Sequence, residues 1–127
     1  MSDAGGPIES VSAITLATRD MAASTRFYEA VGFERRYGGP DSAFTSYRVG
    51  SSFLNIQLDP DHAPVPRVWG RVIFWVADVD ATFDQVRAAG YAPITTPCDA
   101  PWGERYFHVH DPAGHELSFA RPLAPDA

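Results

Sequence analysis

The chain has 127 residues, of which 45% are hydrophobic and 13% aromatic, which is typical of one folded domain with a substantial apolar core. No apolar run approaches the roughly 20 residues that a membrane-spanning helix needs, so we expect no membrane partner. The formal net charge of −6 argues against a nucleic-acid partner, because proteins that bind phosphate backbones usually present a basic face.

The N-terminal stretch MSDAGGPIE has neither a basic start nor an apolar block, so we expect no secretory signal and a cytoplasmic protein. The single cysteine, Cys98, cannot form an intrachain disulfide or a zinc motif by itself, and we expect it to be a partly buried small residue. The chain contains no lysine, which excludes Schiff-base chemistry.

The first half of the chain begins with a predicted strand and helix. Residues 10–18 alternate, with Ile14 and Leu16 on one face and small side chains on the other. A helix is predicted over residues 21–31, because Asp20 is a suitable N-cap and Gly32 a suitable C-terminal stop.

Three further strands are predicted, over residues 33–37, 43–49 and 52–58. In the last of them one face is apolar and the other carries Phe53, Asn55 and Gln57. Residues 59–66, DPDHAPVP, contain three prolines and are predicted to be a surface linker, with His62 solvated.

The second half repeats this plan. A strand is predicted over residues 68–76 and a helix over residues 79–89. A constant offset of 58 positions separates three pairs of matching residues: Asp20 and Asp78, Gly32 and Gly90, Phe33 and Tyr91. The chain is therefore predicted to contain two copies of strand, helix and three strands, with an extra loop inserted at residues 96–104.

The most informative stretch is WGERYFHVHDPAGHELSF, residues 102–119. It alternates on both sides of the turn at residues 111–114, which predicts a β-hairpin. One face would pack on the core, and the other would carry His108, His110, Glu116 and Ser118. This polar face is either functional or simply solvated, as is expected of His110 and His115 beside the turn.

The two copies, the run ITLATRDMAASTRFYEAVGFE and the hairpin FHVHDPAGHELSF together resemble the vicinal oxygen chelate superfamily, which includes glyoxalase I, extradiol dioxygenases and bleomycin-resistance proteins. The resemblance implies an α+β fold of two βαβββ modules with curved mixed sheets, which enclose a ligand cavity, often across a dimer. We expect one domain over residues 1–127, with modules at about residues 10–58 and 67–122 joined by the linker 59–66.

The resemblance also implies where metal-dependent members place their ligands. The corresponding positions in this chain are Ala13, Asn55, Arg71 and Ser118. Metal enzymes need imidazole or carboxylate donors at such positions, whereas Ala13 has no donor and Arg71 is a permanent cation. We therefore expect no metal and no cofactor. An alternative metal site would use His108, His110 and Glu116.

The favoured hypothesis is a protein that resembles bleomycin-resistance proteins and sequesters a small aromatic or heteroaromatic molecule without a metal, as in antibiotic resistance. We expect a homodimer, because two four-stranded sheets expose edges that must be covered. Arg71 could instead form a structural ion pair with Glu116, and Trp75 could be core filler. One alternative is a lyase, isomerase or dioxygenase that uses the site of His108, His110 and Glu116, or metal-free acid–base catalysis by His108 and Glu116. Another is a structural or regulatory homodimer with a vestigial pocket. The predicted ligand-binding residues are Phe53, Asn55, Gln57, Arg71, Trp75, Trp102, Tyr106, His108 and Ser118.

Overall fold

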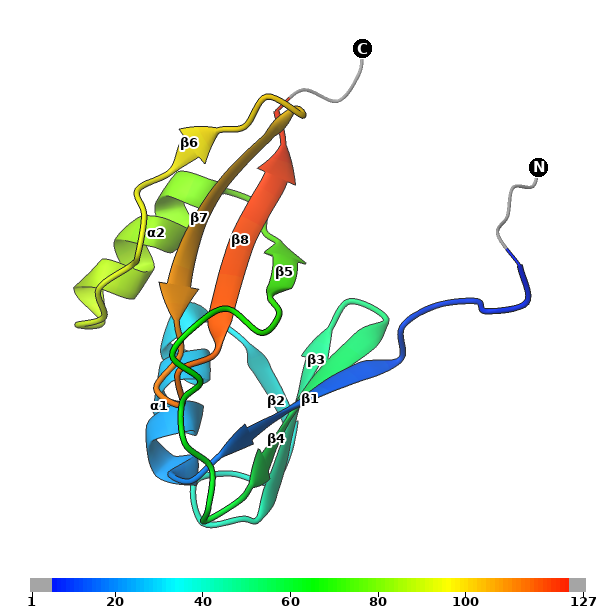
Figure 1. Ribbon diagram of the computed structural model, residues 1–127, viewed down its shortest axis with the longest axis vertical. Coiled ribbons are helices and arrows are strands. Elements are labelled where there is room, and N and C mark those ends of the chain that lie inside the picture. Colours follow the sequence, from blue (N-terminus) through cyan, green and yellow to red (C-terminus); the bar gives the residue numbers. More distant parts are fainter. Residues whose placement is uncertain (1–5, 124–127) are drawn as a thin grey trace.

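The computed structural model describes residues 6–123, which fold into two modules with the same order of elements (Figure 1). The first module consists of β1 (Ala13–Thr18), α1 (Met21–Val31), β2 (Glu34–Tyr37), β3 (Phe44–Val49) and β4 (Ser52–Leu58). The second consists of β5 (Val72–Trp75), α2 (Val79–Ala88), β6 (Cys98–Asp99), β7 (Glu104–His110) and β8 (Glu116–Pro122).

Each module forms a four-stranded mixed sheet in which the first strand pairs in parallel with the last. The strand orders are β1-β4-β3-β2 and β5-β8-β7-β6. Thr15 lies opposite Asn55 in the first sheet, and Ile73 lies opposite Ser118 in the second. Residues 15 and 73 are again 58 positions apart, so Asn55 and Ser118 occupy equivalent places. The predicted α+β fold of two βαβββ modules is confirmed.

The residues that repeat at an offset of 58 positions mark the ends of the two helices. Asp20 and Asp78 cap α1 and α2, and each side chain accepts a hydrogen bond of 3.0 Å from the backbone N–H three residues later. Gly32 and Gly90 follow the two helices with φ values of 118° and 98°, a conformation that glycine adopts without steric cost. The prediction of α1 was correct at both ends, and α2 ends one residue earlier than predicted.

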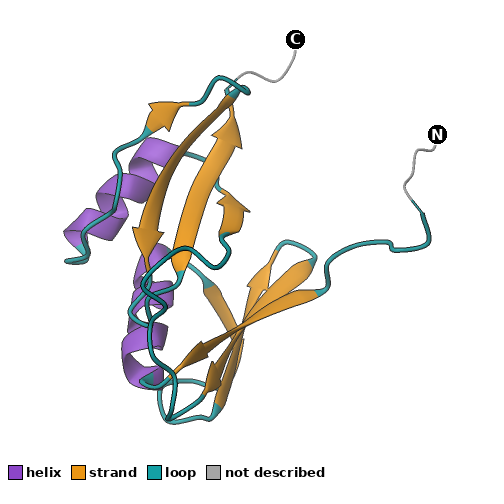
Figure 2. Cartoon of the chain, in the orientation of Figure 1, coloured by secondary structure: helices purple, strands orange, loops and turns teal. Residues whose placement is uncertain are grey.

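Both modules contribute to one hydrophobic core. Figure 2 shows the two helices along the same side of the molecule, where the Gln85 side chain donates a hydrogen bond of 2.9 Å to the Ala30 carbonyl. Phe33 of the first module packs edge-on against Phe74 and Phe119 of the second, with ring centroids 5.0 and 6.3 Å apart. The second module is therefore positioned by apolar packing against the first.

Several boundaries differ from the prediction. β5 begins at Val72 instead of residue 68, and its first paired residue lies opposite Leu117 of β8. The linker is therefore longer than predicted and spans residues 59–71. The predicted loop at residues 96–104 contains the short strand β6. Cys98 is exposed and not partly buried, since β6 is a two-residue strand at the edge of the sheet.

Two histidines that were expected to be solvated are instead structural. His115 is buried, and its Nε2–H donates a hydrogen bond of 2.7 Å to the Ala17 carbonyl of β1. His62 is half-buried, and its Nε2–H donates to the Ala113 carbonyl at 3.0 Å. The two rings lie 5.1 Å apart. The expectation failed because the linker crosses the β7–β8 turn, a contact between segments far apart in sequence.

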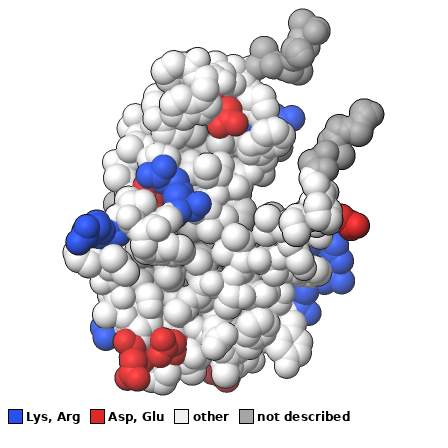
Figure 3. Space-filling view, turned by 45° about the vertical axis from the view of Figure 1, so that its right-hand side comes forward, with Lys and Arg blue, Asp and Glu red and all other residues white. Residues whose placement is uncertain are grey.

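No helix in the described part of the chain is long and apolar enough to span a membrane. On the face shown in Figure 3, charged side chains of both signs form small separate groups on a largely uncharged surface. That face carries no continuous basic patch of the kind that binds a phosphate backbone.

A buried hydrogen bond joins α1 to the β7–β8 turn. The Tyr28 hydroxyl donates to Asp111 Oδ2 at 2.6 Å, and both side chains are buried. The other carboxylate oxygen accepts from the backbone N–H groups of Ala113 and His115, at 3.0 and 2.9 Å. Burial, followed by the neighbouring carboxylate, keeps the pKa of Tyr28 well above its ordinary value, so the hydroxyl remains a donor.

We predict that Tyr28→Phe lowers the free energy of unfolding by about 1–3 kcal/mol, because the buried Asp111 carboxylate loses one of its three donors. Urea denaturation followed by circular dichroism measures this loss. Tyr91→Phe is the matched control, because Tyr91 also packs on Phe27 of α1, at 4.9 Å, and its hydroxyl has no hydrogen-bond partner within residues 6–123. Equal losses in the two variants would contradict the assigned role.

Candidate functional site

The candidate site lies on one face of the second sheet. Side chains alternate along β5, β7 and β8, so each strand sends one set toward the helices and the other set away from them. The inward set is part of the core: Phe74, Phe107, Val109, Leu117 and Phe119. The opposite set, with Arg71 just before β5, forms what we call the outer face: Arg71, Ile73, Trp75, Tyr106, His108, Glu116 and Ser118.

A row of aromatic rings crosses this face. Trp102 stacks on Tyr106 with centroids 6.1 Å apart and an interplanar angle of 23°. Tyr106 lies 5.0 Å from the His108 ring. Trp102 and Trp75 are 70% and 65% exposed. Trp75 is therefore not core filler, and the outer face presents large apolar side chains to solvent.

An ion pair joins Arg71, the residue before β5, to Glu116, the first residue of β8. The Arg71 guanidinium donates from Nε at 2.7 Å and also from Nη2 to Glu116 Oε2. The Glu116 side chain is only 12% exposed. A carboxylate at that depth needs a compensating charge, which Arg71 supplies. The structure thus shows the ion pair between Arg71 and Glu116 that was considered from the sequence.

His108 has an unsatisfied ring nitrogen beside this ion pair. Its Nδ1 is buried without a hydrogen-bond partner among the described residues. Burial, followed by the Arg71 charge, lowers the pKa of His108, and Glu116 opposes this shift only in part. The ring therefore stays neutral at neutral pH and offers one donor and one acceptor.

Cys98 also lies on the outer face, although it was not predicted as a site residue. It lies opposite Tyr106 in the β6–β7 pairing, and the neighbouring Cys98 thiol raises the pKa of the Tyr106 phenol. Ser118 pairs with His108 across β7 and β8 but is buried beneath the larger side chains.

The predicted residues of the first module lie on the other sheet. Asn55 is engaged there, because it donates to Thr15 Oγ1 at 3.3 Å and accepts from Ser46 Oγ at 2.8 Å. Gln57 is exposed near the end of β4.

Among the predicted site residues of the first module, Phe53 is the one that approaches the outer face. It lines a groove of about 330 Å³ together with Arg71 and Ile73, between the β1 and β5 sides of the two modules. The Arg48 guanidinium lies 5.4 Å from the centroid of its ring. The structure therefore brings Phe53 to Arg71, whereas Asn55 hydrogen bonds within its own sheet.

The alternative metal site does not form. His110 Nε2 lies 3.9 Å from Glu116 Oε1, and the other Glu116 oxygen is held by Arg71. Within residues 6–123 no group of three or more His, Cys, Asp or Glu side chains is placed to hold a metal ion. A divalent ion at Glu116 would also meet the fixed positive charge of Arg71. These residues do not fit the ion that metal-dependent superfamily members carry.

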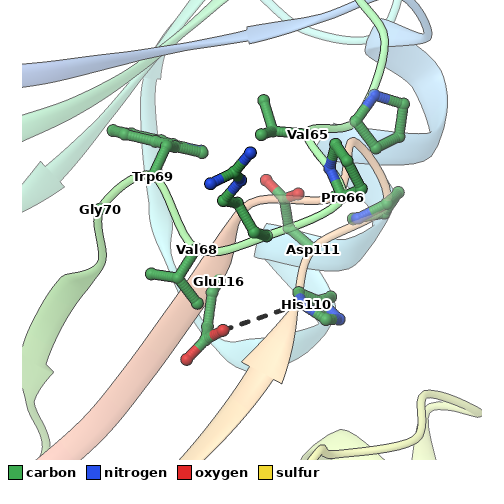
Figure 4. Close-up of a pocket in the computed structure, with 12 residues that line it drawn as sticks. Val65, Pro66, Val68, Trp69, Gly70, His110, Asp111 and Glu116 are labelled. Atoms are coloured by element: carbon green, nitrogen blue, oxygen red, sulfur yellow. Dashed lines mark ion pairs between the residues drawn. The ribbon is translucent and has the colours of Figure 1, made fainter.

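A second cavity, of about 470 Å³, lies where the linker crosses the β7–β8 turn (Figure 4). Its walls include Val65, Trp69 and His110. This cavity was not predicted from the sequence, because residues 64–70 meet residues 110–116 only after folding.

Comparisons with known proteins place the chain in a family. The family model described as Glyoxalase/Bleomycin resistance protein/Dioxygenase superfamily matches residues 10–119. An uncharacterised protein of Mycolicibacterium smegmatis is 34% identical over 116 residues, which cover 89% of this chain and 94% of that protein. An uncharacterised protein of Mycobacterium bovis is 29% identical, covering 85% of this chain and 80% of its own length.

Solved structures agree. TioX from Micromonospora sp. ML1 is 28% identical with a TM-score of 0.72, and the match covers 90% of this chain and 99% of TioX. A putative glyoxalase family protein from Bacillus anthracis has a TM-score of 0.75 at 18% identity, covering 94% of this chain and 99% of that one, and shows the shared fold. With the family model matching nearly all of the described residues, this chain belongs to the glyoxalase/bleomycin resistance protein/dioxygenase superfamily.

Proposed function

We propose that this protein binds and sequesters a planar aromatic or heteroaromatic small molecule on the outer face, without a metal, in the manner of bleomycin-resistance proteins. The observation that carries the proposal is the exposed aromatic row of Trp102, Tyr106 and His108 beside the Arg71–Glu116 ion pair. Flat ligands gain both apolar burial and favourable ring geometry on such a surface.

The charge distribution of the face supports a neutral ligand. Arg71 and Glu116 compensate each other, and His108 is uncharged at neutral pH. These groups together carry no net charge, so they neither attract nor repel a charged ligand. Polar orientation would come from the His108 ring and the Tyr106 hydroxyl, which offer a few directional hydrogen bonds within an otherwise apolar surface.

A second copy of the chain would cover the outer face and turn it into an enclosed ligand site. β1 and β5 are edge strands, and each has one side without a partner strand in its own sheet. Ile73 and Trp75 on β5 are 57% and 65% exposed, which is unfavourable for an apolar edge in water. We propose a homodimer in which the partner covers this edge and encloses the ligand.

His108 supports one alternative, metal-free acid–base catalysis on the bound molecule. Its buried, unpartnered Nδ1 and lowered pKa are features of catalytic as well as of binding histidines. Glu116 is tied to Arg71, so His108 would act as the base in a proton transfer. Turnover of a bound ligand that His108→Asn abolishes without weakening binding would favour this isomerase-type or lyase-type function.

We predict that a panel of neutral planar heteroaromatic compounds such as phenazine contains members that quench the tryptophan fluorescence, and that Trp102→Ala weakens their binding about tenfold through loss of stacking. Tyr37→Ala, which removes a 66% exposed aromatic ring from β2 of the other sheet, is the matched control and should leave the affinity unchanged. Absence of quenching throughout the panel would overturn the proposal.

A second prediction concerns assembly. Light scattering after size-exclusion chromatography should give twice the 13.9 kDa mass of one chain. Ile73→Lys should yield monomers, because it places a charge on the apolar β5 edge. Tyr37→Lys is the control, since Tyr37 is 66% exposed and is the last residue of β2, an edge strand of the other sheet. A wild-type monomer at tens of micromolar would contradict the dimer.

A third prediction follows from the pKa of His108. In an NMR titration its ring should protonate below the ordinary value of 6.5, and Arg71→Gln should raise the midpoint by removing a nearby positive charge and freeing Glu116. Because the folded state takes up this proton less readily than the unfolded chain, acidification below about pH 6.5 should reduce stability. Arg36→Gln, on exposed β2, should leave the midpoint of the His108 titration unchanged. An unshifted midpoint in Arg71→Gln would show that the Arg71 charge does not lower the pKa of His108.

A further inference from the structure

The cavity between the linker and the β7–β8 turn, which we call the linker pocket, is a candidate second binding site. Its volume of about 470 Å³ is within the range of small-molecule sites. Figure 4 shows Val65, Val68 and Trp69 of the linker arranged opposite His110 and Glu116 of the hairpin. The aromatic row of Trp102, Tyr106 and His108 does not line it.

The walls of the linker pocket are held in place by close contacts. A Cβ at Gly114 would lie 2.6 Å from Pro64 Cβ, so linker and turn are packed without a gap at this point. The His62 ring donates to the Ala113 carbonyl at 3.0 Å. Trp69 packs edge-on against buried His115, with centroids 5.6 Å apart. The pocket is therefore preformed, which reduces the entropy lost on binding.

The hydrogen-bonding groups of the pocket are unbalanced. Most acceptors are occupied, because Asp111 receives three donors and Glu116 Oε2 receives two from Arg71, which leaves Glu116 Oε1. The exposed Arg67 guanidinium and Trp69 indole N–H, which also line the pocket, donate to no other group among residues 6–123. A ligand that engages Arg67 and Trp69 must therefore supply acceptors.

We propose that the linker pocket binds a carboxylate carried on a flat apolar body. A carboxylate matches the planar donor fork of Arg67 with two parallel hydrogen bonds. Val65, Val68 and Trp69 provide the apolar wall for the rest of the molecule. A doubly charged phosphate fits less well, because the carboxylates of Asp111 and Glu116 belong to the same walls and would repel a second negative charge.

The test compares 2-naphthoate with its neutral isostere 2-naphthamide. The chain has three tryptophans, so the ¹H–¹⁵N spectrum of the indole groups separates the linker pocket, reported by Trp69, from the outer face, reported by Trp75 and Trp102. Naphthoate should shift the Trp69 signal and bind about tenfold more tightly than naphthamide at that site. Arg67→Gln should remove this preference, whereas Arg36→Gln, an equally exposed arginine on β2, should keep it.

The proposal is overturned if naphthoate leaves the Trp69 signal in place, if naphthamide binds there as tightly as naphthoate, or if Arg67→Gln binds naphthoate as tightly as the wild type. Inorganic phosphate that displaces naphthoate at equal concentration would also refute the preference for a single charge. Signals of Trp75 and Trp102 report on the outer face independently, so failure of either site does not decide the other.

Discussion

The arrangement of the two modules depends on the buried carboxylate of Asp111. It accepts hydrogen bonds from Tyr28 in α1 and from two backbone N–H groups of its own turn, so one side chain both shapes the β7–β8 hairpin and ties it to the first module. A buried carboxylate without these donors would cost several kcal/mol. The surrounding apolar core supplies most of the packing, but this site fixes where the hairpin lies on it.

Both candidate sites are consequences of that hairpin position. β7 and β8 carry His108 and Glu116 on the side away from the helices, and the end of the linker brings Arg71 against Glu116. The same linker crosses the turn that Asp111 holds and so encloses the linker pocket. The ion pair and the pocket thus share a single structural support, and Glu116 belongs to both.

The fold could be predicted from the sequence because its signals are local and repeated. Helix caps such as Asp20 and Asp78, strand alternation and a constant offset need no knowledge of tertiary contacts. The outer face was predicted for the same reason, since strand parity places alternate side chains together. His62, His115 and the linker pocket were missed or misjudged, because their environment is created by segments more than forty residues apart, and no periodicity encodes such a contact.

The polar residues at the superfamily's ligand positions also explain why the outer face favours organic molecules. Asn55 is occupied by hydrogen bonds within its sheet, and Ser118, its equivalent, is buried. Neither presents a free donor atom to a metal. What remains accessible on the second sheet is mainly ring surface, of which Trp75 and Trp102 expose the greatest fractions. Binding there must draw its free energy from burial of apolar area and from stacking, which suits a flat ligand enclosed by a second protein surface.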